Sequence, residues 1–254
     1  MRNITVNIIP QLKDNYSYII ESEEDYFAVI IDPAEVESHC NFLQKKNLNL
    51  DSIILTHHHH DHTSGVRSLL KKYPSAKVYS PNTLIDGTTN LIQNNDLIKT
   101  PLNNFDVIAT PGHTLDHIIL YDKINALLFS GDTLFHLGCG RVFEGTFEQM
   151  YASLQKINNL PDKTLVYCGH EYTMNNLNFL ESIFEEIREL KELRTIIEKK
   201  INMSSRTIPF FLGEEKRINP FLNQSSYIFD SFKKNRNLSN FEMFKFIREK
   251  KDNF

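Results

Sequence analysis

Short apolar runs separated by polar breaks make up most of the first two thirds of the chain. Runs rich in β-branched and aromatic residues predict strands. The stretches of this kind are residues 4–9, 16–20, 26–31, 52–55, 77–80, 105–109, 117–121, 126–129 and 164–167. Residues 35–46, 64–72 and 147–158 have helical composition, and residues 83–96 fit neither pattern clearly. Strands that alternate with helices predict an α/β domain.

The last third of the chain has a helical pattern instead. Apolar residues at spacings of three and four predict one long amphipathic helix or two shorter ones within residues 175–200. Residues 204–222 contain two prolines and a glycine, which predict short helices and turns. Residues 239–251 begin a further helix, with Ser239 and Glu242 spaced as a capping box. We therefore expect two domains, an α/β domain of residues 1–172 and a helical domain of residues 173–254.

Composition narrows the class of protein. The chain has 254 residues, of which 41% are hydrophobic and 24% charged, values typical of a globular protein. A net charge of -4 gives no basic surface for nucleic acid. The first twenty residues resemble neither a signal peptide nor a membrane span, because a proline and charged residues interrupt them. Three cysteines without framework spacing, Cys40, Cys139 and Cys168, indicate a reducing compartment and hence a cytoplasmic location.

The run THHHHDH at residues 56–62 has the highest density of potential metal ligands in the sequence. His57, His59, Asp61 and His62 form an H-x-H-x-D-H pattern directly after the predicted strand 52–55. Imidazole and carboxylate are ligands of first-row divalent metals. In an extended segment His57 and His59 project to the same side, and Asp61 and His62 follow in a turn where they face a second ion. The ordinary alternatives are a solvated polar loop and a purification tag, and the internal position of the run, interrupted by an acid, argues against a tag.

Three other predicted strands also end in a potential ligand. Residues 105–109 lead to His113, residues 126–129 lead to Asp132, and residues 164–167 lead to His170. Each of these alone has an ordinary explanation as a turn residue. Ligands gather at the carboxyl edge of an α/β sheet, so the repeated arrangement predicts a metal site. Three histidines lack this context and are predicted to be structural or to support the ligands: His39, His117 and His136.

These motifs resemble those of known families. The H-x-H-x-D-H run with the three downstream ligands is similar to the metallo-β-lactamase fold, a four-layer αβ/βα sandwich with a dinuclear site. Further stretches, which together cover nearly the whole chain, resemble the hydroxyacylglutathione hydrolases (glyoxalase II): DNYSYII, TPGHT, SGDTLFHLGCGRVFEGT, CGHEYT, INPF and REKKDNF. The resemblance implies an α/β fold of this type with a C-terminal α-helical domain.

The resemblance also implies a ligand set for two divalent ions per chain. One ion is bound by His57, His59 and His113, and the other by Asp61, His62 and His170, while Asp132 bridges them. Asp61 and Asp132 are the residues that it marks as catalytic. Zinc is expected first, with iron and manganese as alternatives, because imidazole and carboxylate suit all three metals.

The implied reaction is hydrolysis of S-D-lactoylglutathione, or a related S-2-hydroxyacylglutathione, to D-lactate and glutathione. This is the second step of methylglyoxal detoxification by the glyoxalase pathway. Two ions about 3.5–4 Å apart lower the pKa of a bridging water, and the resulting hydroxide attacks the thioester carbonyl. The leaving thiol has a pKa of about 8.5, so its thiolate departs with little help from an acid.

Substrate recognition is assigned to residues near the C-terminal domain. Arg248 and Lys251 are three apart on a predicted helix and can bind one anion together. By resemblance they bind glutathione, with help from Arg141 and Tyr172. This chain has Phe143 where the family often has a tyrosine, and Arg141 where lysine is common. The lost hydroxyl predicts weaker affinity for glutathione or a preference for a related thiol.

Other functions compete with this one. A persulfide dioxygenase or another thioesterase of the same fold is the nearest alternative, and a catalytically silent metal-binding subunit is a second. A nucleic-acid-processing relative would need a large inserted domain, for which the length leaves no room. The expected partner is therefore the glutathione thioester alone, with no nucleic acid and no membrane, and the resemblance implies a monomer.

Overall fold

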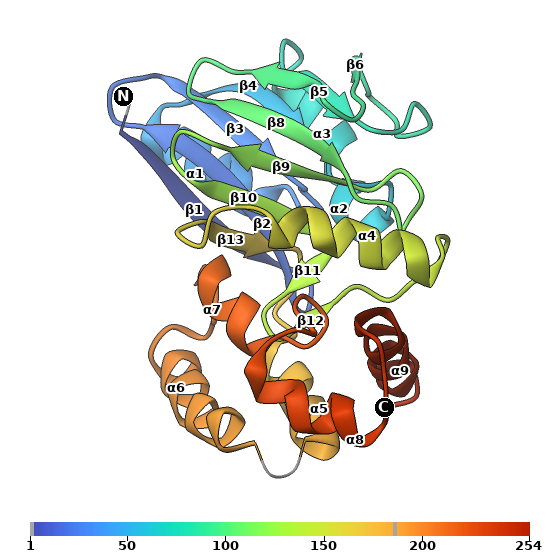
Figure 1. Ribbon diagram of the computed structural model, residues 1–254. Helices are drawn as coiled ribbons and strands as arrows, with labels where there is room; N and C mark the ends of the chain where they lie inside the picture. The colour runs from blue at the N-terminus through green and yellow to red at the C-terminus, as the bar shows by residue number, and fades with distance from the viewer. Residues whose placement is uncertain (1–2, 185–186) are drawn as a thin grey trace. The chain divides into compact units, whose positions relative to one another are not determined.

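The computed structural model describes residues 3–184 and 187–254 (Figure 1). The chain divides into two compact units. The first consists of Met1–Ala109 with Asp116–Asn125, and the second of Thr110–Leu115 with Ala126–Phe254. Both contain strands and helices, as the alternating pattern predicts.

A six-stranded sheet in the order β1-β2-β3-β4-β5-β6 forms the larger part of the first unit. Its strands are β1 (Ile4–Gln11), β2 (Asn15–Ser22), β3 (Phe27–Ile31), β4 (Asn49–Ile54), β5 (Lys77–Ser80) and β6 (Asn90–Leu91). The β1-β2-β3 portion is antiparallel, and β3 to β6 run parallel. The unit also contains the antiparallel strands β7 (Leu97–Lys99), β8 (Asn104–Ala109) and β9 (Ile118–Asp122).

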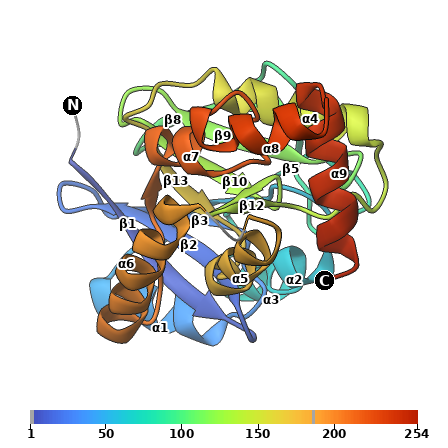
Figure 2. The same ribbon diagram turned by 60° about the horizontal axis from the view of Figure 1, so that its bottom comes forward.

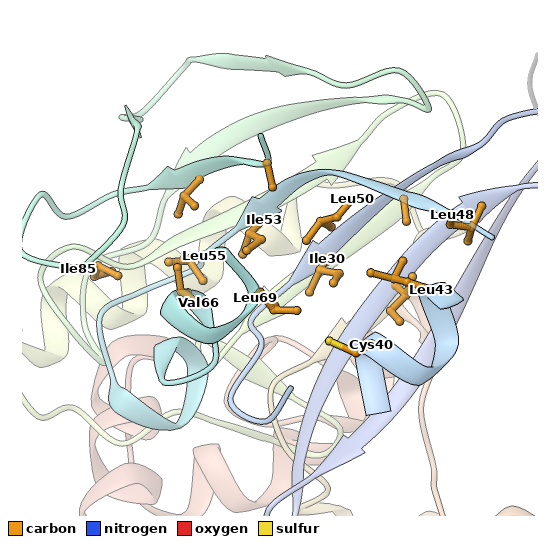
Figure 3. Packing of buried hydrophobic residues seen from close by; sticks show 14 residues of the cluster. Ile30, Cys40, Leu43, Leu48, Leu50, Ile53, Leu55, Val66, Leu69 and Ile85 are labelled. Carbon is orange, nitrogen blue, oxygen red and sulfur yellow. The ribbon is translucent and has the colours of Figure 1, made fainter. Parts of the chain in front are cut away.

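Two helices pack on one face of the six-stranded sheet. Cys40 and Leu43 of α1 (Glu37–Lys46), and Leu69 of α3 (Val66–Lys72), meet Ile30 and Ile53 of the central strands (Figure 3). Each of these side chains is at most 2% exposed. Residues three apart on a helix lie on the same side, which is why Cys40 and Leu43 both reach the sheet. The packing fixes the end of β4, from which the histidine run begins.

The second unit is built on a parallel strand pair. Strands β10 (Leu127–Gly131) and β13 (Leu165–Cys168) are parallel neighbours, and β14 (Phe210–Phe211) pairs antiparallel with β13. The chain between β10 and β13 forms the hairpin of β11 (Leu134–Phe135) and β12 (Gly138–Cys139), followed by α4 (Phe147–Asn158). Thr146 caps α4 through a capping box with Gln149.

The rest of the second unit is helical (Figure 2). Its elements are α5 (Thr173–Ile183), α6 (Arg188–Ser204), α7 (Leu212–Ile218), the 3-10 turn η1 (Tyr227–Phe229), α8 (Asp230–Asn235) and α9 (Asn240–Asp252). The predicted pattern over residues 175–200 therefore forms two helices, and positions 185–186 within it lie outside the described residues. The capping box of α9 is confirmed, because Ser239 Oγ accepts from the Glu242 N–H at 3.2 Å.

The structure adds elements that the sequence pattern did not predict. The segment of Asp61 and His62, expected as a turn, is the short helix α2 (His60–Thr63). Strands of two or three residues, such as β7, β11, β12 and β14, are too short to show a period of two. In the part of the chain that the structure describes, no helix is both long and apolar enough to span a bilayer. The domain division at residue 172 stays a prediction.

Candidate metal centre

The first unit gathers the four donors of the H-x-H-x-D-H run. His57 Nε2 lies 3.1 Å from His59 Nδ1, and the ring centroids of His57 and His62 are 4.3 Å apart. His62 Nε2 lies 3.7 Å from Asp61 Oδ2. His57 is 0% and His62 is 1% exposed. The alternation inferred from the sequence thus places His57 and His59 together, and α2 turns the next two donors toward them.

Asp32 supports this cluster through hydrogen bonds to Thr56 and His62. Its carboxylate accepts the Thr56 N–H at 2.8 Å, the Thr56 hydroxyl at 2.6 Å and His62 Nδ1–H at 3.1 Å. A carboxylate on one ring nitrogen fixes the tautomer and leaves the other nitrogen, here Nε2, as the metal donor. Asp32 follows β3 at a φ of 51°, which aims its side chain across to the end of β4.

Other contacts of the run distinguish the predicted metal ligands from residues that support them. Asn15 Nδ2 donates to Asp61 Oδ2 at 2.8 Å and orients that carboxylate. His58 Nδ1 lies 2.9 Å from Asp116 Oδ1, so this ring has a carboxylate partner outside the H-x-H-x-D-H run. His117 stacks on His57 with centroids 4.8 Å apart, which agrees with a supporting role.

The second unit has a donor cluster of its own. Asp132 Oδ2 lies 3.4 Å from His113 Nε2 and 3.3 Å from His170 Nε2. Asp132 and His170 leave the same edge because β10 and β13 are parallel, with Gly131 paired to Cys168. A side chain at Gly140 would place its Cβ 1.9 Å from the Asp132 carbonyl oxygen, so only glycine fits there. The three donors are 4% to 5% exposed.

Both clusters fit divalent metal ions. Each one brings imidazole nitrogens and carboxylate oxygens together, with His59 and Asp61 partly exposed and the other donors buried, and these donors match first-row divalent metals. His113 Nδ1–H donates to the Arg141 carbonyl at 2.9 Å, so its Nε2 remains for an ion. Buried carboxylates need a cation or hydrogen-bond donors as partners. The donor chemistry therefore supports divalent metal binding without selecting the element.

Two aromatic residues predicted to contact substrate lie against the donors of the second unit. Tyr172 stacks on His170 with centroids 4.6 Å apart. Phe143 packs edge-to-face on His113 at 5.2 Å, and its side chain is 60% exposed. The Arg141 guanidinium lies 5.6 Å from the Phe143 ring centre. The position that departs from the family thus presents an exposed apolar ring beside a donor.

The predicted cations of α9 are engaged within the unit. Arg248, 4% exposed, donates to the Cys139 carbonyl at 2.9 Å and to Asp252 Oδ1 at 2.9 Å. Lys251 donates to Asn175 at the start of α5, with its Nζ 3.2 Å from the carbonyl oxygen. Burial, together with the nearby Arg248 charge, lowers the pKa of Lys251 to about 8.

Three residues of these networks were missed in the sequence. Asp32 and Asn15 support donors, and Asp252 joins two arginines. The rule that found the ligands, a polar residue just past a strand, applies equally to Asp32 after the predicted strand 26–31. Asn15 and Asp252 lie in the motifs DNYSYII and REKKDNF, but those motifs assign them no role, because their partners are distant along the chain.

Comparison with known proteins defines the class first. Residues 12–170 match the family model described as metallo-beta-lactamase superfamily, and residues 171–254 match the model described as hydroxyacylglutathione hydrolase C-terminus. The chain therefore has an α/β metallo-β-lactamase fold followed by a C-terminal helical region, which confirms the predicted fold class. A crystal structure of ETHE1 from Myxococcus xanthus is similar, with a TM-score of 0.68, 27% identity and 95% of each chain covered.

Sequence relatives then define the family. The chain is 41% identical over 249 residues to the hydroxyacylglutathione hydrolases of Pectobacterium carotovorum subsp. carotovorum and Pectobacterium atrosepticum. These matches cover 97% of this chain and 98% of each relative. The chain belongs to the hydroxyacylglutathione hydrolase family within the metallo-β-lactamase superfamily, as the sequence motifs predict.

Proposed function

We propose that the chain hydrolyses S-D-lactoylglutathione, and related S-2-hydroxyacylglutathiones, to the hydroxy acid and glutathione. Family membership over nearly the whole chain is the observation that carries this proposal. The buried imidazole and carboxylate clusters support a metal-dependent hydrolase. The cations on and near α9 support a substrate that bears carboxylates.

The proposed ligand set is the one that the resemblance implies. His57, His59 and His113 would hold one ion, Asp61, His62 and His170 would hold the other, and Asp132 would be shared between them. Two such ions supply Lewis acidity and lower the pKa of water toward neutrality. Zinc is the proposed metal, because imidazole and carboxylate donors suit it, although iron and manganese accept the same donors.

The protein's own residues then orient the groups. Asp32 fixes the His62 ring and Asn15 fixes the Asp61 carboxylate. Tyr172 and Phe143 border the donors of the second unit, where the acyl and thiol parts of the substrate are proposed to lie. Arg141, Arg248 and Lys251 are proposed to attract the glutathione carboxylates. The leaving thiolate has a conjugate acid of pKa about 8.5, so the site needs no dedicated general acid.

The test is turnover of S-D-lactoylglutathione by metal-analysed protein, with chelated protein as the control. We expect hydrolysis that follows the metal content, at up to two ions per chain. Asp132→Ala should lose metal and turnover together. Asp116→Asn is the matched control, because Asp116 is also a carboxylate bound to a histidine, His58, outside the proposed ligand set.

Two outcomes would contradict the proposal. Full turnover by Asp132→Ala would remove the bridging assignment. Consumption of dioxygen with glutathione persulfide, without thioester hydrolysis, would replace the reaction with that of a dioxygenase. A monomeric state and a cytoplasmic location stay predictions, and the molar mass in solution tests the first of them.

A further inference from the structure

One carboxylate of the second unit is shared by two arginines. Asp252 Oδ1 accepts from Arg248 Nη2 at 2.9 Å and from Arg248 Nε at 3.2 Å. Arg141 Nε lies 3.6 Å from the same oxygen. Arg248 is buried, whereas the side chain of Arg141 is 56% exposed. A buried cation and an exposed cation are thus held around a single anion.

Arg248 is fixed on its other side as well. Its Nη1 donates to the Cys139 carbonyl at 2.9 Å, and its guanidinium lies 5.3 Å from the centre of the Phe221 ring. Cys139 ends β12, two residues before Arg141. Arg248 therefore binds the backbone near Arg141, and Asp252 binds the side chain of Arg141. Of these two links, only the one from Asp252 reaches the exposed guanidinium, which also lies 5.6 Å from the centre of the Phe143 ring.

The stability of α9 does not account for an acid at this position. Asp252 is the last residue of α9, and the negative end of the helix dipole disfavours a carboxylate there. An acid four residues after its basic partner is also the less favourable order for a pair on a helix. The neighbouring residues Lys250 and Lys251 follow the usual preference for basic side chains in the last turn of a helix. The two guanidinium groups, which would repel each other without an anion between them, provide a better reason.

We propose that Asp252 is a positioning residue for substrate recognition, which holds Arg141 beside Arg248 so that Arg141 and Lys251 meet the carboxylates of the glutathione part. This inference rests on the proposed function and deepens it. The carboxylate thus lies between the guanidinium groups of Arg248 and Arg141 and gives the cluster a defined geometry.

The variant Asp252→Asn separates positioning from simple charge. If Asp252 only reduced the positive charge of the site, its removal would strengthen attraction for the anionic substrate and lower KM. A positioning role predicts the opposite, a KM for S-D-lactoylglutathione raised roughly tenfold, because the ion pair that holds Arg141 is lost and the hydrogen bonds from Arg248 lose their charged acceptor. Asp252→Glu keeps the charge and should recover part of the loss. Glu249→Gln, which removes one negative charge from an exposed site on the same helix, should leave KM near that of the wild type.

Three further readouts complete the experiment. The first is hydrolysis of a small lactoyl thioester of N-acetylcysteamine, and the second is metal content; Asp252→Asn should change neither. The third is the affinity for glutathione measured by calorimetry, which should fall in Asp252→Asn as KM rises. An unchanged or lower KM in Asp252→Asn, or an equal loss on both thioesters, would overturn the role of Asp252.

The calorimetry also keeps this inference distinct from the proposed function. Wild-type protein that binds glutathione without hydrolysing its thioester would remove the proposed reaction, and the effect of Asp252→Asn on binding would still decide the positioning role. Wild-type protein that binds no glutathione would overturn the inference itself.

Discussion

The phenol ring of Tyr172 stacks on the imidazole of His170, with centroids 4.6 Å apart and planes 8° from parallel. Both residues follow β13. Phe135 lies nearly perpendicular to both rings, with its centroid 5.1 Å from that of Tyr172 and 5.9 Å from that of His170. A residue that we assign to substrate binding therefore also orients a proposed metal ligand, and the two roles can be separated by substitution.

Tyr172→Phe should keep the stack and lose only the hydroxyl group. We expect unchanged metal content and a KM for S-D-lactoylglutathione raised roughly two- to tenfold. This increase corresponds to the net free energy of one hydrogen bond, about 0.5–1.5 kcal/mol. Tyr172→Ala removes the ring as well, so metal content should also fall. Metal analysis beside steady-state kinetics on both variants checks this. Loss of metal from Tyr172→Phe would show that the stack is not what orients His170.

Asp32→Asn tests the support behind His62. The amide keeps one acceptor where the carboxylate accepts three hydrogen bonds. We expect metal affinity to fall roughly ten- to a hundredfold, as it does when the partner of a histidine ligand is removed. Competition with a chromophoric chelator measures the affinity. The variant Asp116→Asn, in the partner of His58, serves as control and should retain wild-type affinity.

The strands were predictable because their side chains are apolar in short, separated runs. The run at residues 52–55 predicts β4, and residues 77–80 match β5 without error. The start of α1 at Glu37 rather than residue 35 lies within the usual fraying of helix ends. The break between α5 and α6 was left open, since the apolar spacing of three and four continues through it.

The donors could be found from sequence more readily than their partners. His57 and His59 stand out because ligands and strand are contiguous in the chain. Asp32, in contrast, looks like an ordinary turn residue before a proline. Its role comes from β3 and β4 being parallel neighbours, which brings their ends together. Asp252 contacts Arg141 only through tertiary packing, and such contacts cannot be predicted from residue spacing.

The depressed pKa of Lys251 predicts a pH-dependent KM. Burial and the nearby Arg248 charge bring this pKa to about 8, so the ammonium loses its proton as pH rises through that value. Neutral Lys251 no longer attracts a carboxylate, and KM for the glutathione thioester should rise above pH of about 8. Lys251→Arg stays charged and should remove this rise. Steady-state profiles of both proteins between about pH 6.5 and 9.5 check the expectation; parallel profiles would exclude Lys251 as the titrating group.

His39 predicts a pH-dependent stability in the first unit. Burial lowers its pKa from 6.5 to about 4. The unfolded chain therefore binds a proton below pH 6.5 that the folded protein does not bind until about pH 4. The free energy of unfolding falls as pH decreases through this window, by about 1.4 kcal/mol per pH unit and about 3 kcal/mol in all.

Chemical denaturation of wild type and His39→Gln at several pH values isolates this contribution. Glutamine can replace the contact of His39 Nε2 with Ser17 Oγ, 2.8 Å away, and does not titrate. The slope of unfolding free energy against pH should be smaller in the variant between about pH 4 and 6.5. Equal slopes would show that other groups cause the acid sensitivity.

The parallel pairing of β10 with β13 has a consequence for how this scaffold can diversify. Parallel neighbours need a crossover connection, and here the crossover is the chain from Asp132 to Thr164. It contains Arg141 and Phe143, both proposed to contact the thiol part of the substrate. Backbone contacts at Gly140 and Arg141 fix the path of this segment beside Asp132 and His113, whereas the exposed side chains of Arg141 and Phe143 are not part of the strand pairing. Substitution at these two positions can therefore change specificity for the thiol, while the register of the strands, and with it the spacing of Asp132 and His170, is retained.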